Sequence, residues 1–596
     1  MHPFTLFFTI EEYTMMPISN VPMNTHNLAK PSAAVRRLPS AVWLFLGALC
    51  YYVALPPLNI AALALAVPIC WGIFILAQER GGVSPPVRWY WVYLAAFLFW
   101  FASIWWIACP HPLTSIGLLA LAAYLSLYWV LFFIAIRVAV HRFHIPLFVA
   151  MPVCWIGTEY WRCNVVLGGF SFCSLEHALY LYPACIQLAS IGGGLLVGGG
   201  IVLCGALIAS VFFQRNAEAA VHCVIAAILV FVFPVSMMGY GLIEKEKKIR
   251  EKFGEKLSCA SIVALQGDRQ VRLNSTPEEN NATFKQYIDL TYQAANKKPD
   301  LIILPETVCP IPVLLFEGSV APADLDLTGE EATEWERWFR QFVDQIDTPV
   351  VFGLSTLIFK DNSEKPLRLN SALLVQPQRG DELGKIVRYD KMHPVMFGEY
   401  VPFAKYLPDD FILRTLCPEA HAGNKPVAFP IGWAGQGSKE RKTVMASVNI
   451  CFESSVAPLI RRNVLELRKQ GHDPRVLINI SNVGWFWFSQ QIEQHLATHV
   501  FRAVENRMWY VTATNGGFSA IISPTGIIES IGKRGEAEAV SGTVLVDLQK
   551  EHSLTFYQKY GDWYALLFGL IVLGLAIEGV RRQKSGVRRK QNGVGE

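Results

Sequence analysis

The stretch VMASVNICFE, residues 444–453, places a cysteine and a glutamate directly after an apolar run. The run Val444–Ile450 has the length and composition of a buried β-strand. Open α/β sheets collect their reactive side chains at the carboxyl ends of such strands. The stretch therefore predicts an α/β domain, and it makes Cys451 and Glu453 candidate functional residues.

Two segments upstream have the same arrangement. Glu306 follows the apolar run Leu301–Leu304, and Lys391 follows the run Lys385–Tyr389. A partly buried carboxylate can act as a general base, and a fixed ammonium can stabilise an oxyanion and favour a thiolate. Together with the Cys451 thiol, these groups are the parts of an acyl-transfer site.

Each of these residues alone also has a purely structural interpretation. A single cysteine is most often a small buried hydrophobe, and single glutamates and lysines are most often solvated. Here the polar neighbours Asn449 and Glu453 favour a functional thiol, and Pro305 fixes the backbone before Glu306. The functional interpretation requires that the three side chains meet in space.

The surrounding sequence alternates between strand-like and helical patterns. Buried strands mixed with amphipathic helices predict a layered α/β domain. Strands are predicted at 261–266, 301–304, 350–354, 371–376, 385–389, 444–450, 476–480, 508–514 and 519–523. Helices are predicted at 278–297, 331–346, 455–470 and 491–507.

Outside this region the chain has the composition of a membrane protein. Of its 596 residues, 52% are hydrophobic and 17% are charged, whereas soluble domains contain roughly 25% charged residues. The net charge of +4 is too small to indicate a nucleic-acid partner. A membrane span needs about 20 mostly apolar residues. Eight runs are candidates, at 41–57, 60–77, 89–108, 113–136, 145–160, 185–213, 220–242 and 562–580.

Basic residues predict how these spans are oriented. With eight spans, one set of basic segments falls on the same side, which the positive-inside rule makes cytoplasmic. These segments contain Arg36, Arg37, Arg80, Arg88, Arg137, Arg142, Arg215 and the basic tail. In a bacterium the chain would be a multi-pass protein of the inner membrane with its catalytic domain in the periplasm. The predicted organisation is a cytoplasmic extension (1–40), a seven-span domain (41–242), the catalytic domain (243–558), a last span (559–580) and a basic cytoplasmic tail (581–596).

The cysteines do not indicate a metal site. None of the 13 cysteines forms a CxxC pair or a cluster with metal-ligand spacing. Most lie in apolar runs, where cysteine is usually buried. We therefore expect no metal and no cofactor.

Two features are candidates for lipid contact. The segment SNVGWFWF, residues 481–488, places four aromatic residues after a strand. Neighbouring aromatic residues cannot all face one core, so the segment is interpreted as a loop that faces the bilayer or an acyl chain, with core packing as the alternative. Asn482, Trp485 and Phe486 are its candidate substrate-binding residues. Arg162 follows the fifth span and would meet a lipid phosphate or anchor the chain at the interface.

Together these segments resemble the nitrilase superfamily, and the whole arrangement resembles the bacterial apolipoprotein N-acyltransferases over about residues 41–580. The resemblance implies an α-helical membrane bundle of about eight spans plus an α/β nitrilase-like domain, an αββα sandwich, inserted before the last span. It is carried by matches in the same order as in the family: Pro305-Glu306, Lys391 with FGEYVP at 397–402, Cys451-Phe452-Glu453, RAVENR at 502–507 and ATNGG at 513–517.

The resemblance also implies an activity. Glu306 would be the general base, Lys391 the oxyanion stabiliser and Cys451 the nucleophile. Glu399 and Glu453, with Phe452, would support the thiol and the substrate. The family moves an acyl chain from a phospholipid, usually phosphatidylethanolamine, through a cysteine thioester. The acceptor is the α-amine of the lipidated N-terminal cysteine of a diacylglyceryl apolipoprotein, and the enzyme would act as a monomer in the bilayer.

Two other functions are compatible with parts of the sequence. A membrane-anchored nitrilase-type amidase would share the three residues but pass the acyl group to water, and it would not need eight spans. A non-catalytic scaffold or transporter would explain the spans, but these lack the acidic and basic residues of an ion path. The chain departs from the family at Leu304, where tryptophan is usual, and at Val483-Gly484, which leaves the lipid donor open.

Overall fold

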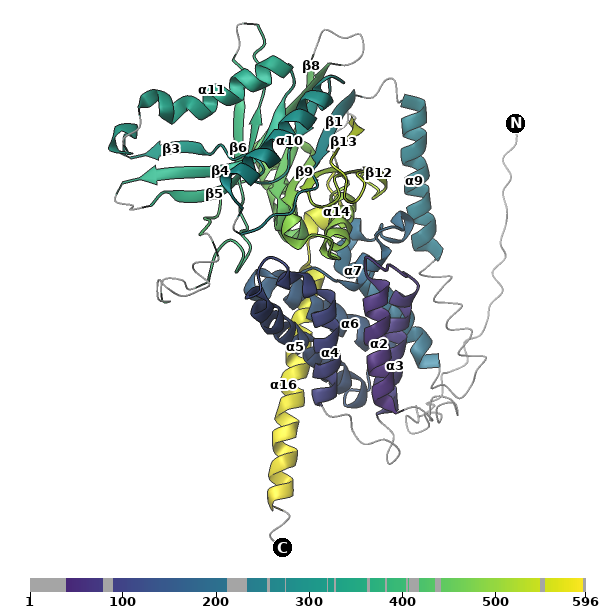
Figure 1. Cartoon of the computed structure of the whole chain (residues 1–596). Helices are drawn as coiled ribbons and strands as arrows, with labels where there is room; N and C mark the ends of the chain where they lie inside the picture. Colours follow the sequence, from purple (N-terminus) through teal and green to yellow (C-terminus); the bar gives the residue numbers. More distant parts are fainter. Residues whose placement is uncertain are drawn as a thin grey trace, which may run out of the picture.

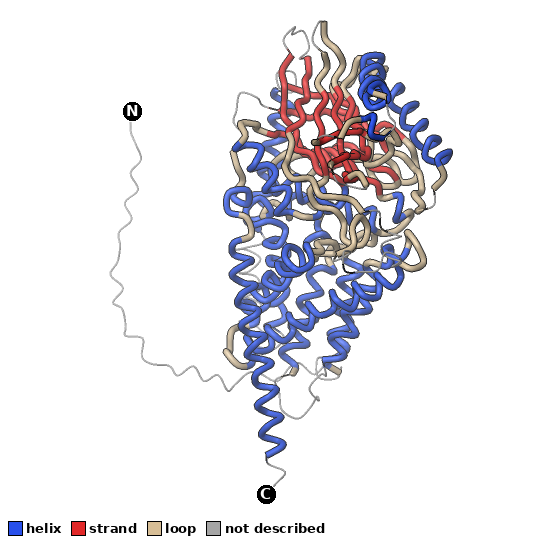
Figure 2. The backbone as a smooth tube through the Cα atoms, turned by 90° about the vertical axis from the view of Figure 1, so that its left-hand side faces the viewer, coloured by secondary structure: helices blue, strands red, loops and turns tan. Residues whose placement is uncertain are grey.

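The computed structural model describes residues 39–78, 89–211, 233–253, 258–546 and 553–592, except for loop residues 274, 319, 326–327, 362–364, 381–382, 403–405, 407–416, 418 and 435–440. Long helices gather at one end of the molecule and strands at the other (Figure 2). The last helix, α16 (Trp563–Asn592), leaves the strand-rich end and runs the length of the helical end (Figure 1).

The helical end is built from apolar helices with few charges. Among the residues that the structure describes, three helices are long and apolar enough to cross a membrane: α5 (Thr114–His141), α7 (Ala189–Val211) and the Trp563–Arg581 part of α16. These correspond to the fourth, sixth and eighth predicted spans. The other apolar helices of this region are shorter: α2 (Ser40–Ala54), α3 (Leu63–Ala77), α4 (Trp89–Ser103) and α6 (Leu147–Tyr160).

The remaining membrane predictions are met in part. The seventh predicted span, 220–242, lies mostly outside the described residues, as does most of the extension 1–40. Helix α9 (Phe233–Phe253) continues through the expected boundary at residue 242, so the first strand of the sheet region begins only at Ser258. Helix α16 extends to Asn592, which places most of the predicted basic tail in the same helix as the last span.

Small residues allow the apolar helices to approach closely, as the glycine run in 185–213 predicts. A Cβ on Gly199 of α7 would lie 2.4 Å from Ile156 Cδ1 of α6. A Cβ on Gly157 of α6 would lie 2.4 Å from the Phe568 carbonyl oxygen of α16. The bundle therefore packs α6 closely between α7 and α16, with no room for a side chain at either glycine.

The other end holds two mixed β-sheets. One is seven-stranded with the order β13-β1-β2-β4-β5-β6 and β3 beside β4, and the other is six-stranded with the order β12-β11-β10-β9-β8-β7. The first sheet contains β1 (Ser258–Gln266), β2 (Leu301–Ile303), β3 (Val313–Glu317), β4 (Val350–Lys360), β5 (Leu367–Val375), β6 (Ile386–Asp390) and β13 (Glu538–Val546). The second contains β7 (Ala428–Ala434), β8 (Arg441–Ile450), β9 (Pro474–Asn482), β10 (Trp509–Asn515), β11 (Ala520–Ile522) and β12 (Ile528–Ile531).

The two sheets face each other, and helices cover their outer faces. A core of buried side chains from both sheets, among them Ile262 and Ile478, fills the space between them. Helices α10 (Pro277–Ala295) and α11 (Gly329–Ile346) cover the first sheet, and α13 (Ala457–Lys469) and α14 (Gln491–Asn506) cover the second (Figure 1). This is the predicted αββα sandwich.

The sequence predicted all four covering helices and nine of these thirteen strands to within a few residues at most ends, with β4 and β5 longer than expected. It missed β3, β7, β12 and β13. Helices α10 and α11 each begin with a capping box, in which Thr276 pairs with Glu279 and Thr328 with Glu331. These polar signals explain why both helix starts lie one or two residues before the predicted apolar pattern.

Candidate active site

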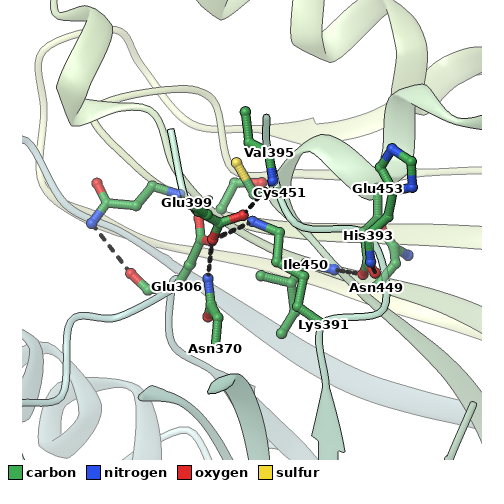
Figure 3. Close-up of polar contacts among 12 residues, drawn as sticks. Glu306, Asn370, Lys391, His393, Val395, Glu399, Asn449, Ile450, Cys451 and Glu453 are labelled. Carbon is green, nitrogen blue, oxygen red and sulfur yellow. Dashed lines mark hydrogen bonds and ion pairs between the residues drawn. The ribbon is translucent and has the colours of Figure 1, made fainter. Parts of the chain in front are cut away.

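Three strand ends bring the predicted catalytic side chains together. Glu306 follows β2 after two residues, Lys391 directly follows β6, and Cys451 directly follows β8. Glu306 is 5% exposed and Lys391 is 1% exposed. Figure 3 shows the three side chains converging in one space between the two sheets. The requirement that they meet is fulfilled.

Lys391 is held by two carboxylates. Its Nζ donates to Glu306 Oε1 at 3.1 Å and to Glu399 Oε1 at 2.9 Å. Asn370 of β5 bridges the same two oxygens, with Nδ2 at 2.6 Å from Glu306 Oε1 and 2.9 Å from Glu399 Oε1. The Asn482 backbone N–H donates to Glu306 Oε2 at 2.9 Å. Each of these polar groups is thus fixed by at least two partners (Figure 3).

Burial and charge set the protonation of the site. Burial raises the pKa of the Cys451 thiol well above its ordinary value, Glu306 adds to this, and Lys391 opposes it. Burial alone would lower the pKa of the Lys391 ammonium, but Glu306 and Glu399 raise it well above its ordinary value. The resting site therefore holds a neutral thiol beside a charged lysine, although the sequence had suggested that Lys391 favours a thiolate.

The backbone at the nucleophile is held in an unusual conformation. Cys451 has φ +53°, in the left-handed region that non-glycine residues rarely adopt. It begins the short helix η9 (Cys451–Ser455), which turns the chain away from β8. Its carbonyl oxygen accepts from the Ser454 hydroxyl at 3.0 Å and from Asn479 Nδ2 at 3.3 Å, and lies 3.3 Å from His495 Nε2. Such strain persists only where the surroundings impose it.

Glu453 ties this turn to the segment that carries Lys391. Its carboxylate accepts from the backbone N–H groups of Met392 at 2.7 Å, His393 at 2.9 Å and Ile450 at 2.7 Å. It also accepts from the Tyr389 hydroxyl at 2.9 Å. Glu453 is fully buried. It therefore fixes the Cys451 turn relative to the segment that carries Lys391.

The residues of segment 481–488, predicted to contact lipid, differ in how far they are buried. The Phe486 ring lies 4.8 Å from the Trp106 ring of the helical end, and Trp485 is half-buried. Phe488 is 62% exposed, as expected for part of an outward-facing aromatic run. Asn482 is buried at the carboxylate of Glu306 and is a site residue, not a surface contact.

Arg162 differs most from the expectation. It was predicted to lie at the surface, where it would meet a lipid phosphate, but it is 1% exposed. Its guanidinium forms an ion pair with Glu159 and donates to carbonyl oxygens of Phe170 and Phe172. The partners of Arg162 are internal because the chain after α6 folds back over it.

The sequence did not single out Asn370 or assign a role to Tyr389. Asn370 lies inside strand β5, and Tyr389 is the buried residue two positions before Lys391. An asparagine in the middle of a buried strand was the one available signal, because buried polar groups need partners.

The comparisons with known proteins agree with this two-part architecture. Residues 47–207 match the family model described as the apolipoprotein N-acyltransferase N-terminal domain. Residues 263–552 match the carbon-nitrogen hydrolase model. The first match covers helices of the bundle, and the second covers the sandwich with all three candidate catalytic residues.

Two relatives align with most of this chain, and a third aligns with half of it. An apolipoprotein N-acyltransferase of Geobacter metallireducens is 28% identical over 470 residues, which are 78% of this chain and 81% of the relative. One of Rhodopirellula baltica is 24% identical over 549 residues, 83% of this chain and 90% of the relative. Apolipoprotein N-acyltransferase 2 of Treponema denticola is 32% identical over 309 residues, half of each chain. The chain belongs to the apolipoprotein N-acyltransferase family.

In this apolipoprotein N-acyltransferase family member, we expect Glu453→Gln to destabilise the sandwich. The amide would present an N–H to groups that are themselves donors, so at least one buried donor would lose its partner. Each such loss costs about 1–3 kcal/mol. The thermal unfolding midpoint of the purified protein in detergent should fall measurably. Glu466→Gln, which removes an exposed ion pair with Lys469, is the control and should leave the midpoint unchanged. Equal midpoints for both variants would contradict this role of Glu453.

Proposed function

We propose that this protein transfers a fatty acyl chain from a phospholipid to the α-amino group of the lipidated N-terminal cysteine of apolipoproteins. The observation that carries the proposal is the meeting of Glu306, Lys391 and Cys451 in a buried site beside apolar helices. The family membership supports the same activity. Phosphatidylethanolamine is the proposed donor, and diacylglyceryl apolipoproteins are the proposed acceptors.

In the first half-reaction, Cys451 Sγ attacks the ester carbonyl carbon of the phospholipid. Glu306 takes the thiol proton during the attack, because the neutral thiol needs a base at that moment. The Lys391 ammonium stabilises the oxyanion. The carbon–oxygen bond then breaks, and the lysophospholipid alcohol leaves with the proton from Glu306. The product is a thioester on Cys451.

In the second half-reaction, the α-amine of the apolipoprotein attacks the thioester carbonyl. Glu306 takes a proton from the attacking amine and returns it to the leaving thiol of Cys451, so that the enzyme is restored. Lys391 again faces the oxyanion. Asn370 and Glu399 hold the Lys391 ammonium and the Glu306 carboxylate in fixed positions during both steps.

The proposed location is a bacterial inner membrane with the sandwich in the periplasm. The distribution of arginines and lysines around eight spans supports this orientation. A donor in the outer leaflet and an acceptor anchored by its own lipids would both reach a site at the membrane surface. We propose that the protein acts as a monomer, because one chain supplies every group used above.

Intact-mass spectrometry of the purified protein with phosphatidylethanolamine tests the proposal. We expect a fatty-acyl adduct on Cys451 that hydroxylamine removes and that a diacylated lipopeptide accepts as an amide. An adduct that only water discharges would instead indicate a membrane-anchored amidase. Absence of any adduct would overturn the proposed donor.

A further inference from the structure

A segment of the helical end contacts the turn that carries the nucleophile. This segment, Phe170–Ser174, follows α6 and lies beside η9. The Ser171 hydroxyl donates to the Ser455 carbonyl oxygen at 2.5 Å. The Phe172 ring lies 5.8 Å from the Phe452 ring and 6.0 Å from the His495 ring. The position of this segment therefore affects the residues next to Cys451.

Arg162 holds the segment in place with three of its N–H donors and binds Glu159 with the other two. Nη1 donates to the carbonyl oxygens of Phe170 at 2.5 Å and Phe172 at 3.0 Å, and Nη2 donates to Ser174 Oγ at 2.9 Å. Nε donates to Glu159 Oε1 at 2.9 Å, and Nη2 also donates to Glu159 Oε2. An arginine has five N–H donors. All five are used inside the protein, so none is left for a lipid phosphate.

The shape of the chain after Arg162 permits this arrangement. Gly169 has φ +84°, and a Cβ there would lie 2.0 Å from the Cys163 carbonyl oxygen. The Phe170 N–H then donates to the Arg162 carbonyl oxygen at 2.8 Å, which closes the loop. The guanidinium also lies 5.1 Å from the centre of the Trp100 ring. Arg162 is thus enclosed by α4, α6 and the segment it holds.

We infer that Arg162 is a positioning residue for the Cys451 thiol. It fixes the backbone of Phe170–Ser174. Ser171 and Phe172 in turn contact the Cys451–Ser455 turn through a hydrogen bond and a ring contact. The strained backbone at Cys451 needs such support from outside its own strand. A displacement of the reacting atoms by about 1 Å costs about 100-fold in rate. The inference rests on the proposed function, because the rate that Arg162 would affect is the rate of acyl transfer.

Arg162→Lys in the full-length protein, reconstituted in nanodiscs with phosphatidylethanolamine, tests this inference. Lysine keeps the charge but has three donors that cannot reach all these acceptors at once. We expect the first-order rate of thioester formation to fall about 10- to 100-fold. The phosphatidylethanolamine concentration at half-maximal rate should not change, because Arg162 does not reach the lipid. Arg142→Lys, at a partly exposed ion pair with Glu578, is the control and should react at the wild-type rate.

Phe172→Ala is the second variant, since it removes the contact with Phe452 but leaves the carbonyl oxygens that Arg162 binds. It should show the same loss of rate, and it decides the question if Arg162→Lys does not fold. Wild-type rates in the folded variants would overturn the inference. A rise in the half-maximal lipid concentration of Arg162→Lys at an unchanged maximal rate would also overturn it, and would favour contact with the headgroup.

A second readout separates this inference from the proposed function. If the wild-type protein forms no thioester with phosphatidylethanolamine, the proposed function fails, but Cys451 can still be alkylated with iodoacetamide. The alkylation rate should then rise in Arg162→Lys and Phe172→Ala, because the thiol is less covered, and should stay unchanged in Arg142→Lys. Equal alkylation rates in all four proteins would overturn the positioning role by itself.

Discussion

Cys451→Ala should reduce acyl transfer by about four orders of magnitude or more, because the covalent step has no other nucleophile. The fatty-acyl adduct in the intact-mass spectrum should disappear completely. Alanine is smaller than cysteine and can occupy the same backbone, so the turn at η9 should remain. We expect the variant to insert into membranes and to unfold at a temperature close to that of the wild type.

Cys109→Ala is the matched control for this result. Cys109 is exposed on the helical end, so it would be the first thiol to react non-specifically. The control should keep both the adduct and the transfer activity. Full activity in Cys451→Ala, or an adduct that follows Cys109, would remove Cys451 as the nucleophile.

The candidate catalytic residues were predictable because Lys391 and Cys451 directly follow their strands and Glu306 follows its strand after two residues. Local patterns located β2, β6 and β8, and the strand ends then placed Glu306, Lys391 and Cys451. Local patterns could not show that these strand ends meet, because β4 and β5 lie between β2 and β6 in one sheet and β8 lies in the other sheet. The two-sheet arrangement came only from the resemblance, and the order of the strands came only from the structure.

One missed strand, β7, has a local sequence that argues against a strand. Strand β7 contains Pro430 and Gly432, which are typical of turns, and it lies at the edge of its sheet with β8 as its neighbour there. Proline is tolerated at such an edge because one side of the strand needs no ladder partner. Position in the sheet, which is a tertiary property, therefore overrode the local preference.

Arg162 and Asn370 are also residues whose structural roles depend on tertiary contacts and could not be predicted from the local sequence. The sequence placed Arg162 correctly after an apolar helix, but only the returning segment Phe170–Ser174 makes it an internal residue. Asn370 bridges Glu306 and Glu399 because the order β2-β4-β5-β6 brings three distant segments together. Residues that act through another residue are defined by contacts that no spacing in the sequence encodes.

Glu306→Gln should lower the rate of thioester formation by about 10²- to 10⁴-fold, the usual contribution of a general base. Glutamine keeps the size of the side chain but cannot take the thiol proton. It also places an N–H among the donors Lys391 Nζ, Asn370 Nδ2 and the Asn482 N–H, which now donate to the carboxylate. We expect the loss in the maximal rate of a single turnover, measured by quenched intact-mass spectrometry.

The pH profile gives this prediction its sharpest test. Burial raises the pKa of the Cys451 thiol, so without a base only hydroxide from solvent would activate it. The residual rate of Glu306→Gln should therefore keep rising with pH beyond the range in which the wild-type rate becomes constant. Glu399→Gln is the comparison, because it removes one partner of Lys391 but leaves the base, and it should lower the rate less and keep the wild-type profile. If Glu399→Gln had the larger loss and the rising profile, the base would be Glu399 and not Glu306.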